Sequence, residues 1–290
     1  MMKEPKVHVG ILFEPQIEFV LLNPYQITGT YCDGVVTHHT VVSGKQVATY
    51  NEGKILWYGR LYDELLFEPI DEATDSFELL DVTIGINFHW ERKEDQRFLG
   101  ALKIITENNK LTAINVIHVE DYLTSVISSE MSATASLELL KAHAVISRSW
   151  LLAIDNSRLT IDNSQLTIVN SMQHASAASN SAAKPSAANC QLSIVNCQLK
   201  WYERDAHTRF DVCADDHCQR YQGITRASTE IVKQAIAATR GQVLMYGGKI
   251  CDARFSKCCG GAFEEFQYCW EDAPHPYLRK QRDFRIFNPK

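Results

Sequence analysis

The hydrophobic period of the chain changes once, after His118, and this change limits the fold more than any other feature of the sequence. From Val7 to His118, short runs of β-branched and aromatic residues are separated by Pro, Gly and Asn, which is typical of β-strands. After His118, apolar residues recur at helical spacing as far as Glu130, and again after Ser136, a suitable helix N-cap. The sequence therefore predicts an α+β protein with a β-rich N-terminal lobe, residues 1–118, followed by a central helical corner that carries Glu130.

The clearest strand pair lies at the end of this lobe. Two apolar runs, Phe98 to Thr106 and Leu111 to His118, flank the tetrapeptide that contains Asn108 and Asn109, which predicts a β-hairpin.

Further along, residues 229–239 have a helical pattern and Gly247-Gly248 favours a hairpin turn. Gly260-Gly261 indicates a loop with unusual backbone angles. These elements predict a C-terminal α+β lobe that forms a groove.

Residues 156–200 differ from the rest of the chain. Near copies of one heptapeptide begin at Asn156, Asn163, Asn189 and Asn196, and the stretch between them is almost all Ala, Ser and Asn. A coiled coil would need charges that the repeats lack, and Leu-Thr-Ile is β-prone. We interpret the segment as a low-complexity repeat insertion, a loop or an added hairpin, which leaves residues 119–155 and 201–290 as the working core.

Composition excludes several classes of function. The net charge of -6 and the absence of a basic run argue against nucleic acid or anionic lipid as a ligand. No apolar stretch approaches the roughly 20 residues of a membrane span, and the N-terminal residues predict no signal peptide. The nine cysteines are odd in number and clustered, which favours metal binding or buried thiols over a disulfide scaffold.

His207, Cys213 and Cys218 form the pattern His-x5-Cys-x4-Cys. Imidazole and thiolate ligands this close in sequence suit a tetrahedral zinc ion, with one further ligand from water, His217, an Asp or another Cys. The alternatives are a Cys213–Cys218 disulfide or two buried thiols.

Glu130 ends the first predicted helix. Its carboxyl would face the negative pole of the helix dipole, with Ile127 and Met131 excluding water, and both effects favour the protonated form. A protonated Glu can donate a proton to a leaving oxygen and then take one back. The alternative is an ordinary solvated helix end.

Three stretches, in order, resemble the stage II sporulation protein D family, whose relatives include amidase-enhancer proteins. Val119–Met131 with Leu137–Trp150 resembles the family's helical segment, and Cys218-Gln-Arg-Tyr-Gln-Gly223 is similar to its Cys-Gln-x-Tyr-x-Gly motif. Residues 237–278, including Gly260-Gly261 and Trp270, resemble its C-terminal pattern.

The resemblance implies a peptidoglycan lytic transglycosylase that leaves a 1,6-anhydro end, with Glu130 as the single acid/base and zinc at His207, Cys213 and Cys218. The 6-hydroxyl of N-acetylmuramic acid is then the nucleophile, so the second carboxylate of ordinary glycosidases is not required. It also implies glycan strands as substrate, a cell-wall amidase as a candidate partner, and a periplasmic or wall-associated location. The alternative is a non-catalytic wall-binding module that activates an N-acetylmuramoyl-L-alanine amidase.

Candidate substrate contacts come from several segments. Lys141 and Arg148, seven residues apart on one helix face, would bind a polar sugar substituent or brace Glu130, unless they form a solvated charged face. Ser256 would hydrogen-bond a sugar, and Gly260 with Gly261 would let the backbone approach it. Tyr221, Trp270 and also Tyr277 would stack on pyranose rings, unless they pack in the core.

Overall fold

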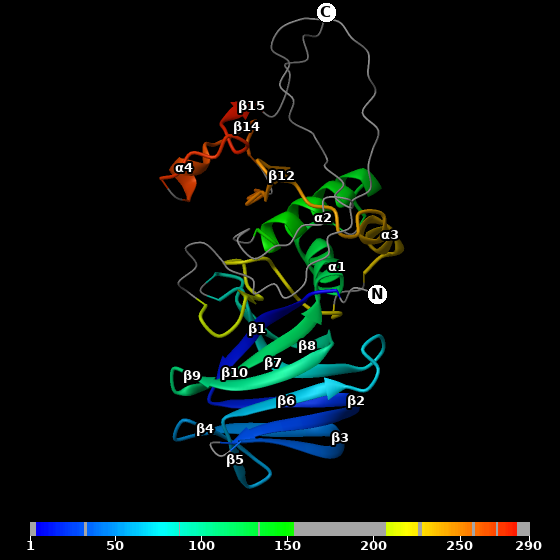
Figure 1. Cartoon of the computed structure of the whole chain (residues 1–290), viewed down its shortest axis with the longest axis vertical. Coiled ribbons are helices and arrows are strands. Elements are labelled where there is room, and N and C mark those ends of the chain that lie inside the picture. The colour runs from blue at the N-terminus through cyan, green and yellow to red at the C-terminus, as the bar shows by residue number, and fades with distance from the viewer. Residues whose placement is uncertain are drawn as a thin grey trace, which may run out of the picture. The chain divides into compact units, whose positions relative to one another are not determined.

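The fold was analysed in a computed structural model of the chain (Figure 1). It describes residues 4–31, 34–86, 88–132, 134–153, 207–225, 228–256, 259–270 and 272–282. The predicted repeat insertion, 156–200, lies outside the described residues. The α+β class is confirmed, because one large strand-rich sheet is accompanied by few helices.

The chain forms two compact units. The first contains Met1–Lys141 and Trp201–Ala238, and the second contains Ala142–Lys200 and Thr239–Lys290. The first unit therefore contains residues on both sides of position 118, and the predicted division into domains stays a prediction.

The first unit is organised by β2, which pairs with β3 along one edge and with β7 and β6 in succession along the other. The sheet order is β11-β1-β10-β9-β6-β2-β3-β4-β5, and β8 pairs with β7. Apart from β11, these strands are blue to green in Figure 1. Their bounds are β1 Lys6–Glu14, β2 Gln16–Tyr31, β3 Gly34–Asn51, β4 Lys54–Trp57, β5 Arg60–Tyr62, β6 Glu64–Pro69, β7 Ser76–Ile84, β8 Arg92–Leu99, β9 Ala101–Glu107, β10 Lys110–His118 and β11 Val212–Cys213.

The predicted hairpin is confirmed as β9 and β10, with Glu107 opposite Lys110. Asn108 and Asn109 connect them with φ of 49° and 60°, a left-handed conformation that Asn tolerates better than most residues. The first strand begins later than predicted. Gly100, with φ of 79°, separates β8 from β9, and a Cβ there would lie 2.5 Å from the carbonyl oxygen of Val116.

The helix α1 (Val119–Glu130) follows β10 directly, as its period predicted. Its apolar residues, including Tyr122, Leu123 and Val126, are fully buried. Because α1 contacts β1, β10 and α3 (Glu230–Ala238), it belongs to the same compact unit as the sheet. The strand β11 joins that unit as well, since it pairs in parallel with β1. These contacts join α1 and β11 to the sheet within the first unit.

The remaining elements lie wholly or partly in the second unit. They are α2 Leu137–Leu151, β12 Met245–Tyr246, β13 Lys249–Ile250, β14 Ala262–Phe263, α4 Phe266–Cys269 and β15 Gln281–Arg282. The N-cap predicted for α2 is confirmed, since the backbone N–H of Leu139 donates to Ser136 Oγ at 3.4 Å. The hairpin around Gly247-Gly248 is confirmed as the β12–β13 pair, and Gly260 and Gly261 have the unusual backbone angles expected, with φ of 67° and 100°.

Among the residues described above, no helix is long and apolar enough to cross a membrane.

Candidate functional site

Glu130, the last residue of α1, is held by a segment that comes 90 positions later in the chain. Its Oε1 accepts a hydrogen bond from the backbone N–H of Arg220 at 3.0 Å, and the side chain is partly buried. The backbone donor fixes the orientation of the Glu130 carboxyl group, because a backbone N–H cannot move as freely as a side chain. Glu130 is therefore not an ordinary solvated helix end.

The segment from Cys218 to Gly223 runs along α1 and bonds to it at two further points. The hydroxyl of Tyr122 donates to Gln219 Oε1 at 3.2 Å, and the backbone N–H of Gln222 donates to Ser125 Oγ at 3.2 Å. Together with the Arg220–Glu130 bond, these contacts align the segment with the end of α1. We call residues 218–223 the docking segment.

Tyr221 of the docking segment lies in the core. It is 1% exposed, and its ring packs against Phe98 at 5.8 Å and Tyr122 at 5.0 Å. Its hydroxyl donates to Asn115 Oδ1 at 2.6 Å, and burial raises the pKa of the phenol above its usual value. A ring without an exposed face cannot stack on a sugar. The predicted sugar contact is corrected for Tyr221, and the core-packing alternative describes it.

Ser125 provides a test of how firmly the docking segment is held. Replacing Ser125 with Ala removes the acceptor for a buried N–H, and we expect a loss of about 1–3 kcal/mol in the free energy of unfolding. Ser128→Ala is the matched control, because Ser128 Oγ donates to the carbonyl of Thr124 within its own helix. Urea unfolding of both variants measures the difference. Equal, small losses would mean that the Ser125 bond does not hold the segment.

Gly223 ends the docking segment where the backbone meets β8. Its φ is 57°, and a Cβ on it would lie 2.2 Å from the carbonyl oxygen of Arg97 and 2.5 Å from the Phe98 ring. The next residue, Ile224, donates its N–H to that same Arg97 carbonyl at 2.8 Å. Only glycine satisfies both the backbone angle and the close approach.

We expect Gly223→Ala to cost about 3 kcal/mol or more in unfolding free energy, because backbone cannot retreat as a flexible side chain can. Gly44→Ala is the control: its φ of 78° is also left-handed, but nothing lies within 4 Å of its Cβ position. The control should lose about 1–2 kcal/mol, from the backbone angle alone. Thermal unfolding of the two variants checks the prediction, and equal losses would contradict it.

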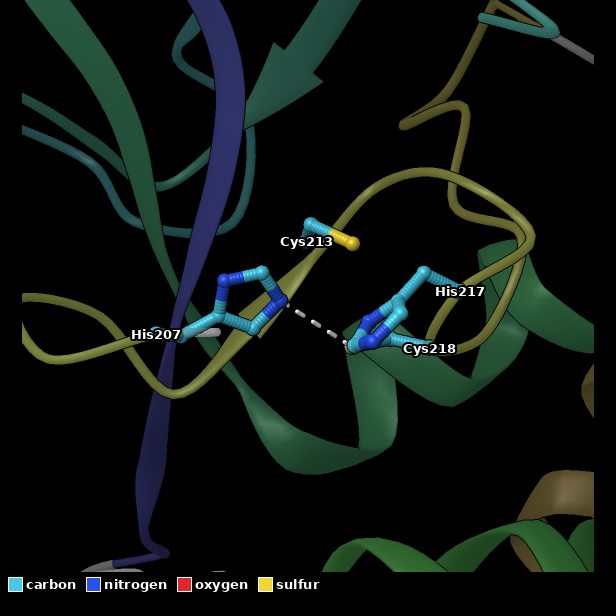
Figure 2. Close-up of side chains that lie close together, drawn as sticks. All are labelled: His207, Cys213, His217 and Cys218. Carbon is cyan, nitrogen blue, oxygen red and sulfur yellow. Dashed lines mark hydrogen bonds between the residues drawn. The ribbon is translucent and has the colours of Figure 1, made fainter. Parts of the chain in front are cut away.

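The His/Cys pattern comes together in space (Figure 2). One ligand atom each from His207, Cys213, His217 and Cys218 lie within 4.8 Å of one another. Cys213 is fixed by the β1–β11 pairing, and the Cys218 N–H donates to the carbonyl of Asp215 at 3.0 Å, a turn that brings Cys218 back toward Cys213. Cys213 and Cys218 are both free thiols.

Two distances in this cluster match those between the ligands of a tetrahedral ion. Cys218 Sγ lies 3.5 Å from His207 Nε2 and 3.5 Å from His217 Nδ1. Zinc bonds of about 2.3 Å to sulfur and 2.0–2.1 Å to nitrogen would place neighbouring ligand atoms about 3.5 Å apart. Hydrogen bonding to Cys218 and burial raise the pKa of the Cys213 thiol to about 12, so a nearby cation would be needed to hold it as a thiolate.

A pocket of about 660 Å³ opens beside this cluster within the first unit. Burial raises the pKa of Asp216 in its wall; Arg220 opposes this effect, and Asp215 and Glu130 add to it. The lining combines apolar and polar side chains, among them Phe13, Ile84, Ile86, Phe88, Gln96, Phe210, Asp215, Asp216, His217 and Arg220.

Sequence reasoning missed the wall residues Asp216 and Arg220. The contact between Arg220 and Glu130 is made by the Arg220 backbone, so the residue type at position 220 does not predict it. Asp216 belongs to no motif with a recognisable spacing in the chain.

Lys141 and Arg148 have different surroundings. Lys141 is partly exposed, and its Nζ pairs with Glu138 at 2.8 Å. Arg148 is fully buried and donates from Nη1 to the backbone carbonyls of Gln242 at 3.1 Å and Ala144 at 3.4 Å. This environment fits neither a solvated charged face nor a sugar-binding guanidinium, so the prediction for Arg148 is corrected: the side chain joins two backbone segments of the second unit.

The other predicted sugar contacts lie at the surface of the second unit. Ser256, Gly260 and Gly261 are exposed. Trp270 is 46% exposed and packs on Phe266, with ring centroids 5.4 Å apart. Their role in binding a sugar stays a prediction.

Fold and site together define an α+β protein in which a helix-end carboxyl is anchored by a segment that begins at a cysteine of the His/Cys cluster. Residues 107–246 match the sequence model of the stage II sporulation protein family. This match assigns residues 107–246 to a stage II sporulation protein D domain, as the motifs predicted. The match contains α1, α3, the docking segment and the His/Cys cluster, and it leaves out most of the N-terminal sheet.

The chain is also similar to an uncharacterized protein of Brachyspira hyodysenteriae. The two are 25% identical over 166 residues, which cover 57% of this chain and 32% of that protein. The match thus spans about a third of the relative's length.

Proposed function

We propose that the chain cleaves the glycan strands of peptidoglycan by a lytic transglycosylase mechanism, with Glu130 as the only acid/base. The observation that carries this proposal is the 3.0 Å bond from the Arg220 N–H to Glu130 Oε1, beside a pocket that Arg220 itself lines. The bond orients the carboxyl group that is proposed to exchange a proton with the substrate.

The reaction begins with Glu130 protonated. Its proton passes to the glycosidic oxygen as the bond from that oxygen to C1 breaks, which leaves a carboxylate on Glu130. The Arg220 N–H stabilises this carboxylate by hydrogen bonding. The 6-hydroxyl oxygen of the same muramic acid unit then bonds to C1 and gives its proton to Glu130. The products are a 1,6-anhydro end and a free 4-hydroxyl, and no water is consumed.

Product mass tests the mechanism directly. Peptide-free glycan incubated with the protein should yield the 1,6-anhydro product, which is one water lighter than a hydrolysis product. Glu130 lies close enough to Asp216 to contribute to the raised pKa of the Asp216 carboxyl. If reducing ends appear instead of the anhydro product, the two carboxyl groups would act together as in an ordinary hydrolase.

Zinc is proposed as a structural ion. His207, Cys213, His217 and Cys218 would hold it, and four protein ligands leave no open position for a water molecule. A bound ion contributes to folding, because it joins residues that the unfolded chain keeps apart. Its place next to the docking segment means that it would support the backbone that holds Glu130.

The alternative remains a wall-binding module that activates an amidase. Such a protein would bind peptide-free glycan and leave it uncut, so the same incubation separates the two functions. Either function would place the protein in the periplasm or at the cell wall.

A further inference from the structure

The connection between β7 and β8 carries an aromatic surface that lies outside the segment matched by the family. Phe88 is 49% exposed, and its ring stacks on Trp90 with centroids 5.4 Å apart and planes at 17°. The Trp90 ring packs so closely against Gly85 that a Cβ built on this glycine would lie 2.2 Å from the ring. Phe88 is therefore a flat, exposed apolar side chain that is supported by Trp90. We call Phe88 and Trp90 the aromatic platform.

Two contacts connect the platform's segment with the region of Glu130. The guanidinium of Arg220 lies 4.7 Å from the centre of the Trp90 ring, within the range of a cation–π contact. The backbone N–H of Ile86 donates to Asp215 Oδ2 at 3.3 Å. Arg220 thus contacts Trp90 with its side chain and Glu130 with its backbone.

The pocket lining limits what can bind there. Phe88 and Ile86 offer apolar surface, while Asp215 and Asp216 offer acceptors for hydroxyl groups. The carboxyl groups of Asp215, Asp216 and Glu107 in the same lining disfavour an anionic ligand. An uncharged pyranose fits this combination, because its C–H face stacks on an aromatic ring and its hydroxyls donate to carboxylates.

We infer that the aromatic platform, with Asp215 and Asp216, is a subsite for an uncharged N-acetylhexosamine unit of the glycan strand, next to the unit on which Glu130 acts. Muramic acid carries a carboxylate and is disfavoured here, so the subsite takes the N-acetylglucosamine unit. The inference rests on the proposed function for its position relative to the cleaved bond. The binding itself does not depend on cleavage.

The test uses the full chain and a β-1,4-linked tetramer of N-acetylglucosamine, which contains no muramic acid. Isothermal titration calorimetry compares the parent with Phe88→Ala, Phe88→Leu and Phe88→Tyr. We expect Phe88→Ala and Phe88→Leu to lower the affinity for the tetramer about tenfold. Phe88→Tyr should keep this affinity within about twofold, because only Tyr retains a flat ring. Tyr58→Ala is the matched control: Tyr58 is 71% exposed, belongs to the same unit and does not line the pocket, so its affinity should be unchanged.

The Leu variant separates binding from packing. Leu still covers Trp90, so a structural role for Phe88 predicts parental affinity for Leu, and this result would overturn the inference. Parental affinity for the Ala variant, or no binding of the tetramer by the parent, would overturn it as well. If the Phe88→Ala protein unfolds at a much lower temperature than the parent, the comparison of tetramer affinity between the Phe88→Leu and Phe88→Tyr variants tests the inference.

Failure of this inference is distinguishable from failure of the proposed function. Peptide-free glycan that is cut normally by the Leu variant, with unchanged tetramer affinity, rejects the subsite and leaves the catalytic proposal intact. A parent that binds the tetramer through Phe88 but yields no anhydro product keeps the subsite and rejects the catalysis.

Discussion

Glu130→Gln should keep the fold and lose release of the 1,6-anhydro product, with a rate lower by roughly 10²–10⁴. Gln retains an oxygen that can accept the Arg220 N–H, so the docking segment keeps its bond to α1. It has no carboxyl proton to donate, so both proton transfers fail. The measurement is mass spectrometry of the products from peptide-free glycan, together with a melting curve that checks the fold.

Glu138→Gln is the matched control for this variant. Glu138 is a carboxyl of the same type whose side chain is 81% exposed and paired with Lys141. Its replacement should leave the rate within about twofold, because an exposed ion pair contributes little to stability. A Glu130→Gln protein that cleaves glycan within a few-fold of the parent would mean that another group carries the proton.

The second large effect concerns the His/Cys cluster. The parent should carry about one zinc ion per chain, and Cys213→Ser, His207→Ala and His217→Ala should each lower the zinc content. Loss of the ion should cost about 3 kcal/mol, which corresponds to a fall of about 10 °C in melting temperature. Elemental analysis and thermal unfolding measure the two effects.

Cys251→Ser controls for the cost of replacing any buried thiol. Cys251 is 4% exposed and lies outside the cluster, so its variant should lose some stability and keep the zinc. A parent without zinc, combined with a mass that indicates a Cys213–Cys218 disulfide, would contradict the metal proposal. A zinc content that survives His217→Ala but not Cys213→Ser would mean that the fourth ligand is not His217.

The docking segment explains why the family's Cys-Gln-x-Tyr-x-Gly pattern needs these residue types. Cys218 belongs to the His/Cys cluster and Gln219 accepts from Tyr122. Tyr221 fills the core, and Gly223 allows the backbone to meet β8. The third position, Arg220, contacts Glu130 through its backbone, which is compatible with a variable side chain.

Much of the fold followed from local signals in the chain. Periodicity predicted the strand-rich lobe and α1, and Asn108-Asn109 predicted the turn between β9 and β10, because both signals act over a few neighbouring residues. The short spacing between His207, Cys213 and Cys218 in the chain predicted that they could bind one metal ion. Glu130 was predicted from its place at a helix end and from the family motif, both of which are sequence properties.

Only the tertiary structure decided which of these side chains meet. It buried Tyr221 and Arg148, added His217 to the cluster, and placed Arg220 between Glu130 and Trp90. Phe88 and Asp216 carry no pattern in the sequence, because their surroundings come from segments more than 100 positions apart, as the Ile86–Asp215 bond illustrates. Local sequence determines the conformation of a segment, whereas burial and the contacts between distant segments arise only when the chain packs.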